Sequence, residues 1–169
     1  MSIDMNGCNM ITEIVKLPAF LYGTIIDIET TGLPYEDAEV ITLGLISGNK
    51  LQIIQRTKEE DFCKQALRLL KGLPRPYYAF NKNFEEHFLG IKIDRELQAH
   101  KYERKREAIR IAGLNDPFKG IGTHVVNAWN KYDSTGNKRC LSHIILHNRA
   151  CLLLEACLVL VRQRKPTGV

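Results

Sequence analysis

Residues 24–33 have the sequence TIIDIETTGL, in which a run of buried-strand character passes into two acids and then into a turn. The isoleucines predict a strand, and Thr-Thr-Gly predicts its end. Asp27 and Glu29 are two positions apart, so on a strand their side chains point to the same face. Carboxylates that close repel each other unless a positive group lies between them. The stretch therefore predicts a strand whose end faces a cation.

The composition is typical of one globular domain. The chain has 169 residues, of which 44% are hydrophobic and 25% charged, and this is enough for a single core without disulfides. The five cysteines are odd in number, scattered and without a CxxC pair, so they predict buried thiols and suggest neither a disulfide framework nor a zinc site. The net charge of +5 permits an anionic partner and is also typical of a solvated surface. We expect a single domain over residues 1–169.

Two observations concern the compartment. Residues 1–20 lack a basic segment followed by an apolar segment and a cleavage site, which predicts that the chain is not secreted. No stretch reaches the roughly 18 consecutive apolar residues that span a bilayer. We therefore expect a cytoplasmic protein without a membrane partner.

The strand patterns predict an α/β fold with a mixed sheet. Residues 22–29 and 39–47 are rich in β-formers, and 50–56 follow a Ser-Gly-Asn turn, so these three segments predict an antiparallel meander. Residues 77–81 predict a short buried strand that leads into a helix at 82–90, as in a parallel pair of strands.

Three further segments predict helices that flank the sheet. Apolar periodicity predicts a helix at 57–73, and the highly charged segment 92–112 predicts a surface helix. Residues 140–164 predict a long helix that is apolar in its middle and packs against the sheet. Residues 113–122 and 133–138 carry glycine, proline and asparagine breakers, which predict loops.

The acids at 27 and 29 are chemically unusual because isoleucines flank them. A carboxylate at the edge of a core is costly unless it is paired or binds a metal. Mg²⁺ and Mn²⁺ take oxygen ligands, and two such ions can stabilise the attacking and leaving oxygens of a phosphodiester. From the residues alone, the alternative is a strand-end acid pair that caps a helix or meets a lysine or arginine.

Two stretches resemble a known family. DIETTGL resembles the first motif of the DEDD exonuclease superfamily, which has the RNase H-like fold and uses two metal ions. Residues 77–89, YYAFNKNFEEHFL, resemble its second motif, in which Asn-x-x-Phe precedes an acid. Asn81 and Phe84 match, and Glu85 stands at the acid position, as in a branch of RNase H-like predicted nucleases.

Residues 129–156 resemble the third motif of that branch, where a tryptophan and tyrosine, a TGN turn and a His-Asn-x-x-Asp helix follow one another. The matching residues are Trp129, Tyr132, Thr135, Gly136, His147 and Asn148. Cys151 stands where the family has aspartate, and a soft thiol is a poor ligand for Mg²⁺. Glu155 is four positions further on and could reach the place of the missing carboxylate.

The resemblance implies an RNase H-like domain that acts as a metal-dependent 3′ to 5′ exonuclease on single-stranded DNA or RNA. Mg²⁺ or Mn²⁺ would be the cofactor. Asp27, Glu29 and Glu85 would hold the metal. His147 would act as general base, and Glu155 would be a further catalytic carboxylate. The residues expected to contact substrate are Thr30, Thr31, Gly32, Leu33, Asn81 and Phe84.

Other interpretations stay open at this point. Glu85 would also be favoured by the dipole at a helix start, His147 could be a core histidine, and Cys151 could be a packed thiol. Asn81 and Asn148 could orient ligands or cap helices. The basic residues of 101–110 suit either phosphate binding or solubility.

Two other function classes compete with the active nuclease. Cys151 at the acid position favours a catalytically impaired, nuclease-like module that still binds nucleic acid. A domain that keeps only the fold and binds a protein partner is the third interpretation.

Overall fold

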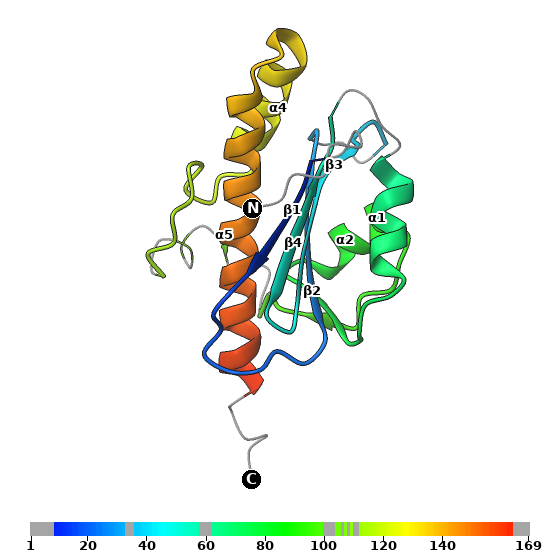
Figure 1. Cartoon of the computed structure of the whole chain (residues 1–169), viewed down its shortest axis with the longest axis vertical. Coiled ribbons are helices and arrows are strands. Elements are labelled where there is room, and N and C mark those ends of the chain that lie inside the picture. Colours follow the sequence, from blue (N-terminus) through cyan, green and yellow to red (C-terminus); the bar gives the residue numbers. More distant parts are fainter. Residues whose placement is uncertain are drawn as a thin grey trace.

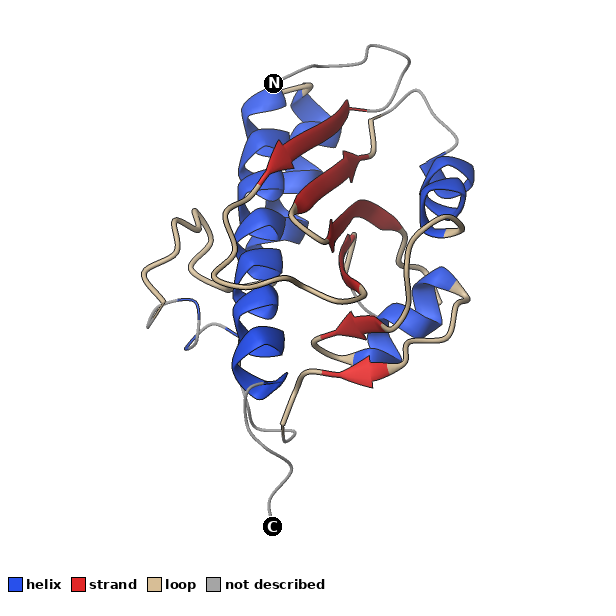
Figure 2. Ribbon diagram, turned by 60° about the horizontal axis from the view of Figure 1, so that its bottom comes forward, coloured by secondary structure: helices blue, strands red, loops and turns tan. Residues whose placement is uncertain are grey.

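The computed structural model describes residues 9–32, 36–57, 62–99, 104, 105, 107, 109 and 112–163. Six strands form one sheet: β1 (Asn9–Ile14), β2 (Thr24–Thr30), β3 (Val40–Ser47), β4 (Lys50–Gln55), β5 (Tyr77–Ala79) and β6 (Arg95–Glu96). Their spatial order is β1-β4-β3-β2-β5-β6 (Figure 2). The first four strands pair antiparallel, whereas β5 runs parallel to β2 and β6 runs parallel to β5.

The sheet lies between two layers of helices. These helices are α1 (Phe62–Leu70), α2 (Lys82–Leu89), α4 (Thr123–Thr135) and α5 (Lys138–Gln163). The long helix α5 crosses one face of the sheet, and α1 and α2 cover the other (Figure 1). This arrangement confirms the predicted mixed α/β fold, and it is consistent with an RNase H-like sheet.

Strand β2 shows how the two faces are built. All seven of its residues are buried, as expected of a strand that is covered on both sides. Ile26 and Ile28 pack in the core cluster that contains α1 and α2, whereas Ile25 packs with apolar residues of α5. Because side chains alternate along a strand, Asp27 and Glu29 share the face of Ile25 and lie under α5.

Strand β1 was not predicted from the sequence. It pairs with β4 along its whole length, from Asn9 opposite Gln55 to Ile14 opposite Lys50. Arg149 of α5 donates hydrogen bonds of 2.7 and 2.6 Å to the two carboxylate oxygens of Glu13. The strand is short and partly polar, so its pattern alone does not distinguish it from a loop, and pairing with β4 decides its structure.

The prediction of a surface helix over 92–112 is wrong in two respects. The segment begins with β6, which extends the parallel part of the sheet. Lys105 and Ile109 have helical backbone, but Ile109 is buried and the Lys105 side chain is only 20% exposed. Ile109 packs on Cys151 and Leu154 of α5, and Lys105 contacts Asp27 of β2 and Glu155 of α5.

Two predicted boundaries also differ from the structure. The loop expected at 133–138 is shorter, because α4 continues to Thr135 and ends at Gly136, whose φ of +69° suits glycine. The helix expected at 57–73 is α1, over a shorter span, and residues 58–61 lie outside the described part of the chain.

Within the described residues, one stretch, Lys138–Val161 of α5, is long and apolar enough to cross a membrane by length and composition alone. In its most apolar window, 61% is buried inside the protein. The core helix of a globular domain meets the same test, and α5 packs on β2, β3 and β4. The absence of a membrane partner stays a prediction.

Candidate functional site

Four carboxylates from three elements converge at one end of β2. Asp27 and Glu29 come from β2, Glu85 from the first turn of α2, and Glu155 from α5; none is more than 9% exposed. A cavity of about 250 Å³, here called the acidic pocket, opens beside them. Its lining includes Asp27, Glu29, Glu85, Lys105, His147 and Cys151.

The parallel pairing of β2 and β5 positions Glu85. The chain leaves β5 at Ala79 and enters α2 with Asn81 as the N-cap residue, so the first turn of α2 starts beside the end of β2. The Asn81 side chain makes no capping hydrogen bond and lines the acidic pocket together with Phe84. Asn81 therefore occupies the N-cap position, but its side chain does not cap the helix.

Helix α5 contributes His147, Cys151 and Glu155, which recur every four positions and therefore lie on one side of the helix. The neighbouring Asn148 donates hydrogen bonds from Nδ2 to Oδ2 of Asp27, at 2.8 Å, and to its main-chain oxygen, at 3.2 Å. Asn148 thus orients the carboxylate of Asp27.

The close approach of α5 to the sheet depends on Gly44. In the antiparallel register, Gly44 of β3 lies directly opposite Asp27. A Cβ atom at Gly44 would collide with the side chains of Asn148 and Leu152. The missing side chain leaves the space in which Asn148 reaches Asp27.

Lys105 occupies the centre of the acid cluster. Its Nζ lies 2.6 Å from Oδ1 of Asp27 and 2.6 Å from Oε1 of Glu155. Burial disfavours the charged ammonium, but Asp27 and Glu155 outweigh it and raise the pKa of Lys105 well above its usual value. This contact matches the alternative that the acids meet a lysine, and it places a cation other than a metal beside Asp27.

One lysine does not balance the negative charge of four carboxylates. Burial, with a smaller contribution from Asp27, raises the pKa of Glu85 to about 8, and burial likewise raises that of Glu29 to about 7. Among the described residues, Oε2 of Glu85 and Oε2 of Glu155 have no hydrogen-bond partner, whereas Oε1 of Glu155 lies 2.6 Å from Nζ of Lys105. Such orphaned buried oxygens fit a hard divalent cation.

His147 is held by an acid that sequence reasoning missed. Its Nδ1 lies 2.9 Å from both carboxylate oxygens of Asp116, which in turn accepts hydrogen bonds from the backbone N–H groups of Phe118 and Gly120. Burial lowers the pKa of His147, but Asp116 and Glu29 outweigh it and raise the pKa above its usual value. Asp116 lies in the loop predicted at 113–122. In the sequence it is one acid among loop residues, and no motif connects it to His147.

The turn after β2 lies apart from the acidic pocket. Thr31 exchanges hydrogen bonds of 2.9 Å with the backbone of Glu39, and Thr30 Oγ1 donates to the Gly32 oxygen at 3.3 Å. Thr30, Thr31 and Gly32 were predicted to contact substrate, but among the described residues none of the three lines the acidic pocket. Leu33, the fourth, lies outside the described residues.

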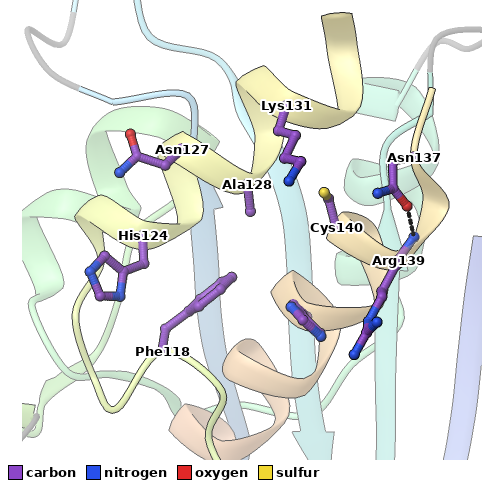
Figure 3. A pocket seen from close by; sticks show the side chains of 9 residues that line it. Phe118, His124, Asn127, Ala128, Lys131, Asn137, Arg139 and Cys140 are labelled. Carbon is purple, nitrogen blue, oxygen red and sulfur yellow. Dashed lines mark hydrogen bonds between the residues drawn. The ribbon is translucent and has the colours of Figure 1, made fainter. Parts of the chain in front are cut away.

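A second cavity, of about 500 Å³, lies between α4, the start of α5 and Phe118 (Figure 3). We call it the basic pocket, because its lining contains His124, Lys131, Arg139 and His143, and no acid among the described residues. The Phe118 ring lies 5.5 Å from that of His147 and 6.0 Å from that of His124. Phe118 therefore lines the basic pocket and packs against His147, which lines the acidic pocket.

Comparison with known proteins found no family model, no curated protein and no solved structure that matches the chain.

Without divalent metal, we expect the protein to lose stability as the pH rises from about 5 to 8. The folded state holds protons on Glu29 and Glu85 that unfolded glutamates, with a pKa of 4.5, have released. The raised pKa of His147 has the same sign, since its stabilising charge is lost as the pH rises. Thermal unfolding in EDTA across this range measures the effect. A midpoint that rises with pH would contradict it.

Proposed function

We propose that the chain is a metal-dependent nuclease that hydrolyses phosphodiester bonds of single-stranded DNA or RNA in the 3′ to 5′ direction. One observation carries the proposal: Asp27, Glu29, Glu85 and Glu155, all buried, converge beside one pocket, and Lys105 is the lysine that lines it. The direction of hydrolysis rests on the resemblance of DIETTGL to the DEDD motif.

The donor set suits Mg²⁺ or Mn²⁺, which Asp27, Glu29 and Glu85 would hold through carboxylate oxygens. When bound, the metal would polarise the phosphate and stabilise the charge that develops on it. Lys105 adds a fixed positive charge at the same place, because Asp27 and Glu155 hold its ammonium group at the pocket wall. A preorganised ammonium of this kind also stabilises developing negative charge.

His147 suits the role of general base. Asp116 binds the Nδ1 side of the ring, so Nε2 faces the acidic pocket and can take a proton from an attacking water. Asp116 also stabilises the imidazolium that forms, and for this reason it raises the pKa of His147. The proton then leaves from Nε2 to solvent or to the departing oxygen.

The basic pocket supports a polymeric anion as substrate. Its lining carries His124, Lys131, Arg139 and His143, and its Phe118 packs against His147 of the acidic pocket. In this proposal the terminal phosphate of a strand binds among the carboxylates and the strand runs towards these basic side chains. Contacts to phosphates supply most of the sequence-independent affinity for nucleic acids.

Incubation with labelled single-stranded oligonucleotides tests the proposal. With Mn²⁺ or Mg²⁺, a 5′-labelled strand should shorten stepwise and a 3′-labelled strand should release labelled mononucleotide, and EDTA should stop both. Asp27→Ala is the control, because it removes a carboxylate that contacts Lys105 and Asn148. A wild-type protein that cleaves neither DNA nor RNA with either metal would contradict the proposal.

A second function is favoured by a separate observation. Lys105 already pairs with Asp27, and Cys151 stands at a position where the resembling family has aspartate, which together suit a nucleic-acid-binding module that has lost turnover. A salt-dependent gel shift without cleavage, equal in wild type and Asp27→Ala, would support this function over the nuclease.

A further inference from the structure

Three side chains of different chemistry meet at the wall of the acidic pocket. The carboxylate of Glu29, Nε2 of His147 and Sγ of Cys151 all lie within 4.8 Å of one another, and all three residues are buried. Glu29 comes from β2 and the other two from adjacent turns of α5. The helical spacing of four positions brings His147 and Cys151 together, but only the packing of α5 on β2 adds Glu29.

The separations are close to those of a tetrahedral metal site. Glu29 Oε1 lies 3.7 Å from His147 Nε2, and Cys151 Sγ lies 3.9 Å from the same nitrogen. With usual zinc bond lengths, donor atoms in a tetrahedral site are about 3.4 to 3.6 Å apart. Small side-chain movements would therefore bring the three donors around one ion.

The surroundings of the three donors also suit a metal. Asp116 faces Nδ1 of His147, which directs the lone pair of Nε2 towards Glu29 and Cys151, and a carboxylate behind a histidine ligand is a common feature of zinc sites. All three donors line the acidic pocket, so a fourth coordination position would face the cavity. Three protein ligands with one open position are typical of reactive zinc sites.

The donor set distinguishes the class of ion. A thiolate and an imidazole favour zinc and similar transition metals, whereas Mg²⁺ prefers oxygen ligands alone. We propose that Glu29, His147 and Cys151 form a binding site for Zn²⁺, with the fourth position open to the acidic pocket. On binding, Cys151 releases its S–H proton to solvent and coordinates as the thiolate. Burial raises the pKa of Cys151 well above its usual value and Lys105 offsets only part of this, so the bound ion itself would supply the charge that stabilises the thiolate.

The site shares residues with the proposed nuclease, but it does not depend on cleavage. Zn²⁺ on Nε2 of His147 would remove the nitrogen that acts as base, so the two uses of His147 exclude each other. Metal binding is therefore measured without nucleic acid. A wild-type protein that cleaves with Mn²⁺ but does not bind Zn²⁺ would overturn this inference alone. A wild-type protein that binds Zn²⁺ but does not cleave would overturn the nuclease proposal alone.

Two measurements on the reduced, chelator-treated protein test the site. Competition with a chromogenic zinc chelator should show one tight Zn²⁺ equivalent, and Co²⁺ in place of Zn²⁺ should give a near-ultraviolet thiolate-to-cobalt charge-transfer band. Cys151→Ser should abolish the band and weaken Zn²⁺ at least about tenfold, and Asp116→Asn should weaken it by roughly 10- to 100-fold.

Cys157→Ser is the matched control, because Cys157 lies on the same helix but is exposed. It should keep both the band and the affinity. A band that survives Cys151→Ser, or that is lost in Cys157→Ser, would overturn the assignment. Circular dichroism of each variant in chelator separates loss of the ligand from loss of the fold, and Cys151→Ala serves as a second variant if Cys151→Ser does not fold.

Discussion

Lys105→Met is expected to lower the free energy of unfolding in metal-free buffer by about 3 to 5 kcal/mol. Methionine keeps an apolar stem of similar length but removes the ammonium that lies 2.6 Å from both Asp27 and Glu155. Two buried carboxylates would then face each other and Glu85 without a counter-charge, which is the costly way to break a buried ion pair. Urea unfolding in EDTA measures the loss.

Divalent metal should separate this effect from a packing defect. Mn²⁺ would supply the missing positive charge, so it should restore more stability to Lys105→Met than it adds to wild type. Lys82→Met is the control, because Lys82 pairs with Glu86 at 3.7 Å on the surface and should matter by less than about 1 kcal/mol. A Lys105→Met protein as stable in EDTA as wild type would contradict the central position of Lys105.

Glu155→Gln is expected to lower the rate of Mn²⁺-supported cleavage by about a hundredfold or more. Glu155 is fully buried on the side of α5 that faces β2, and its carboxylate holds Lys105 against Asp27. The amide would keep the shape of the side chain but remove a charge from the cluster. Initial rates on a labelled single strand, at saturating Mn²⁺, measure the change.

Two variants bracket this measurement. Glu29→Gln removes a predicted metal ligand and should abolish cleavage, whereas Glu107→Gln changes an exposed acid near Lys105 and should leave the rate unaltered. If Glu155→Gln kept full activity while Glu29→Gln had none, Glu155 would not take the place of the aspartate that the resembling family has at position 151. The result therefore decides whether α5 compensates for Cys151.

The acidic pocket also explains why one lysine and a metal need not exclude each other. Asp27 is satisfied by Lys105 and Asn148, but Oε2 of Glu85 and Oε2 of Glu155 lack hydrogen bonds among the described residues. Buried oxygens of this kind are costly, and a cation is the simplest group that satisfies several of them at once.

The central strands could be predicted because long runs of β-branched residues have few alternatives. The predicted segments 22–29, 39–47 and 50–56 correspond to β2, β3 and β4 within about two residues at each end. Strands β1 and β6 could not, because they are edge strands whose pattern is weak and which are defined by their pairing with β4 and β5. The shared face of Asp27 and Glu29 could be predicted, because it follows from the alternation of side chains along a strand.

By itself, the sequence of this protein determined the mixed sheet, the long apolar helix and the common face of Asp27 and Glu29, because these depend on periodicities of two and 3.6 residues along the chain. Only the tertiary structure decided the partners: Lys105 in the acid cluster, Asp116 behind His147, and Glu29 beside Cys151. A run of charged residues or a single acid in a loop has the same sequence pattern whether its side chains are exposed to solvent or form part of a buried functional site. What distinguishes the two is the burial of opposite charge from distant elements, and that is settled only when β2, α2 and α5 pack together.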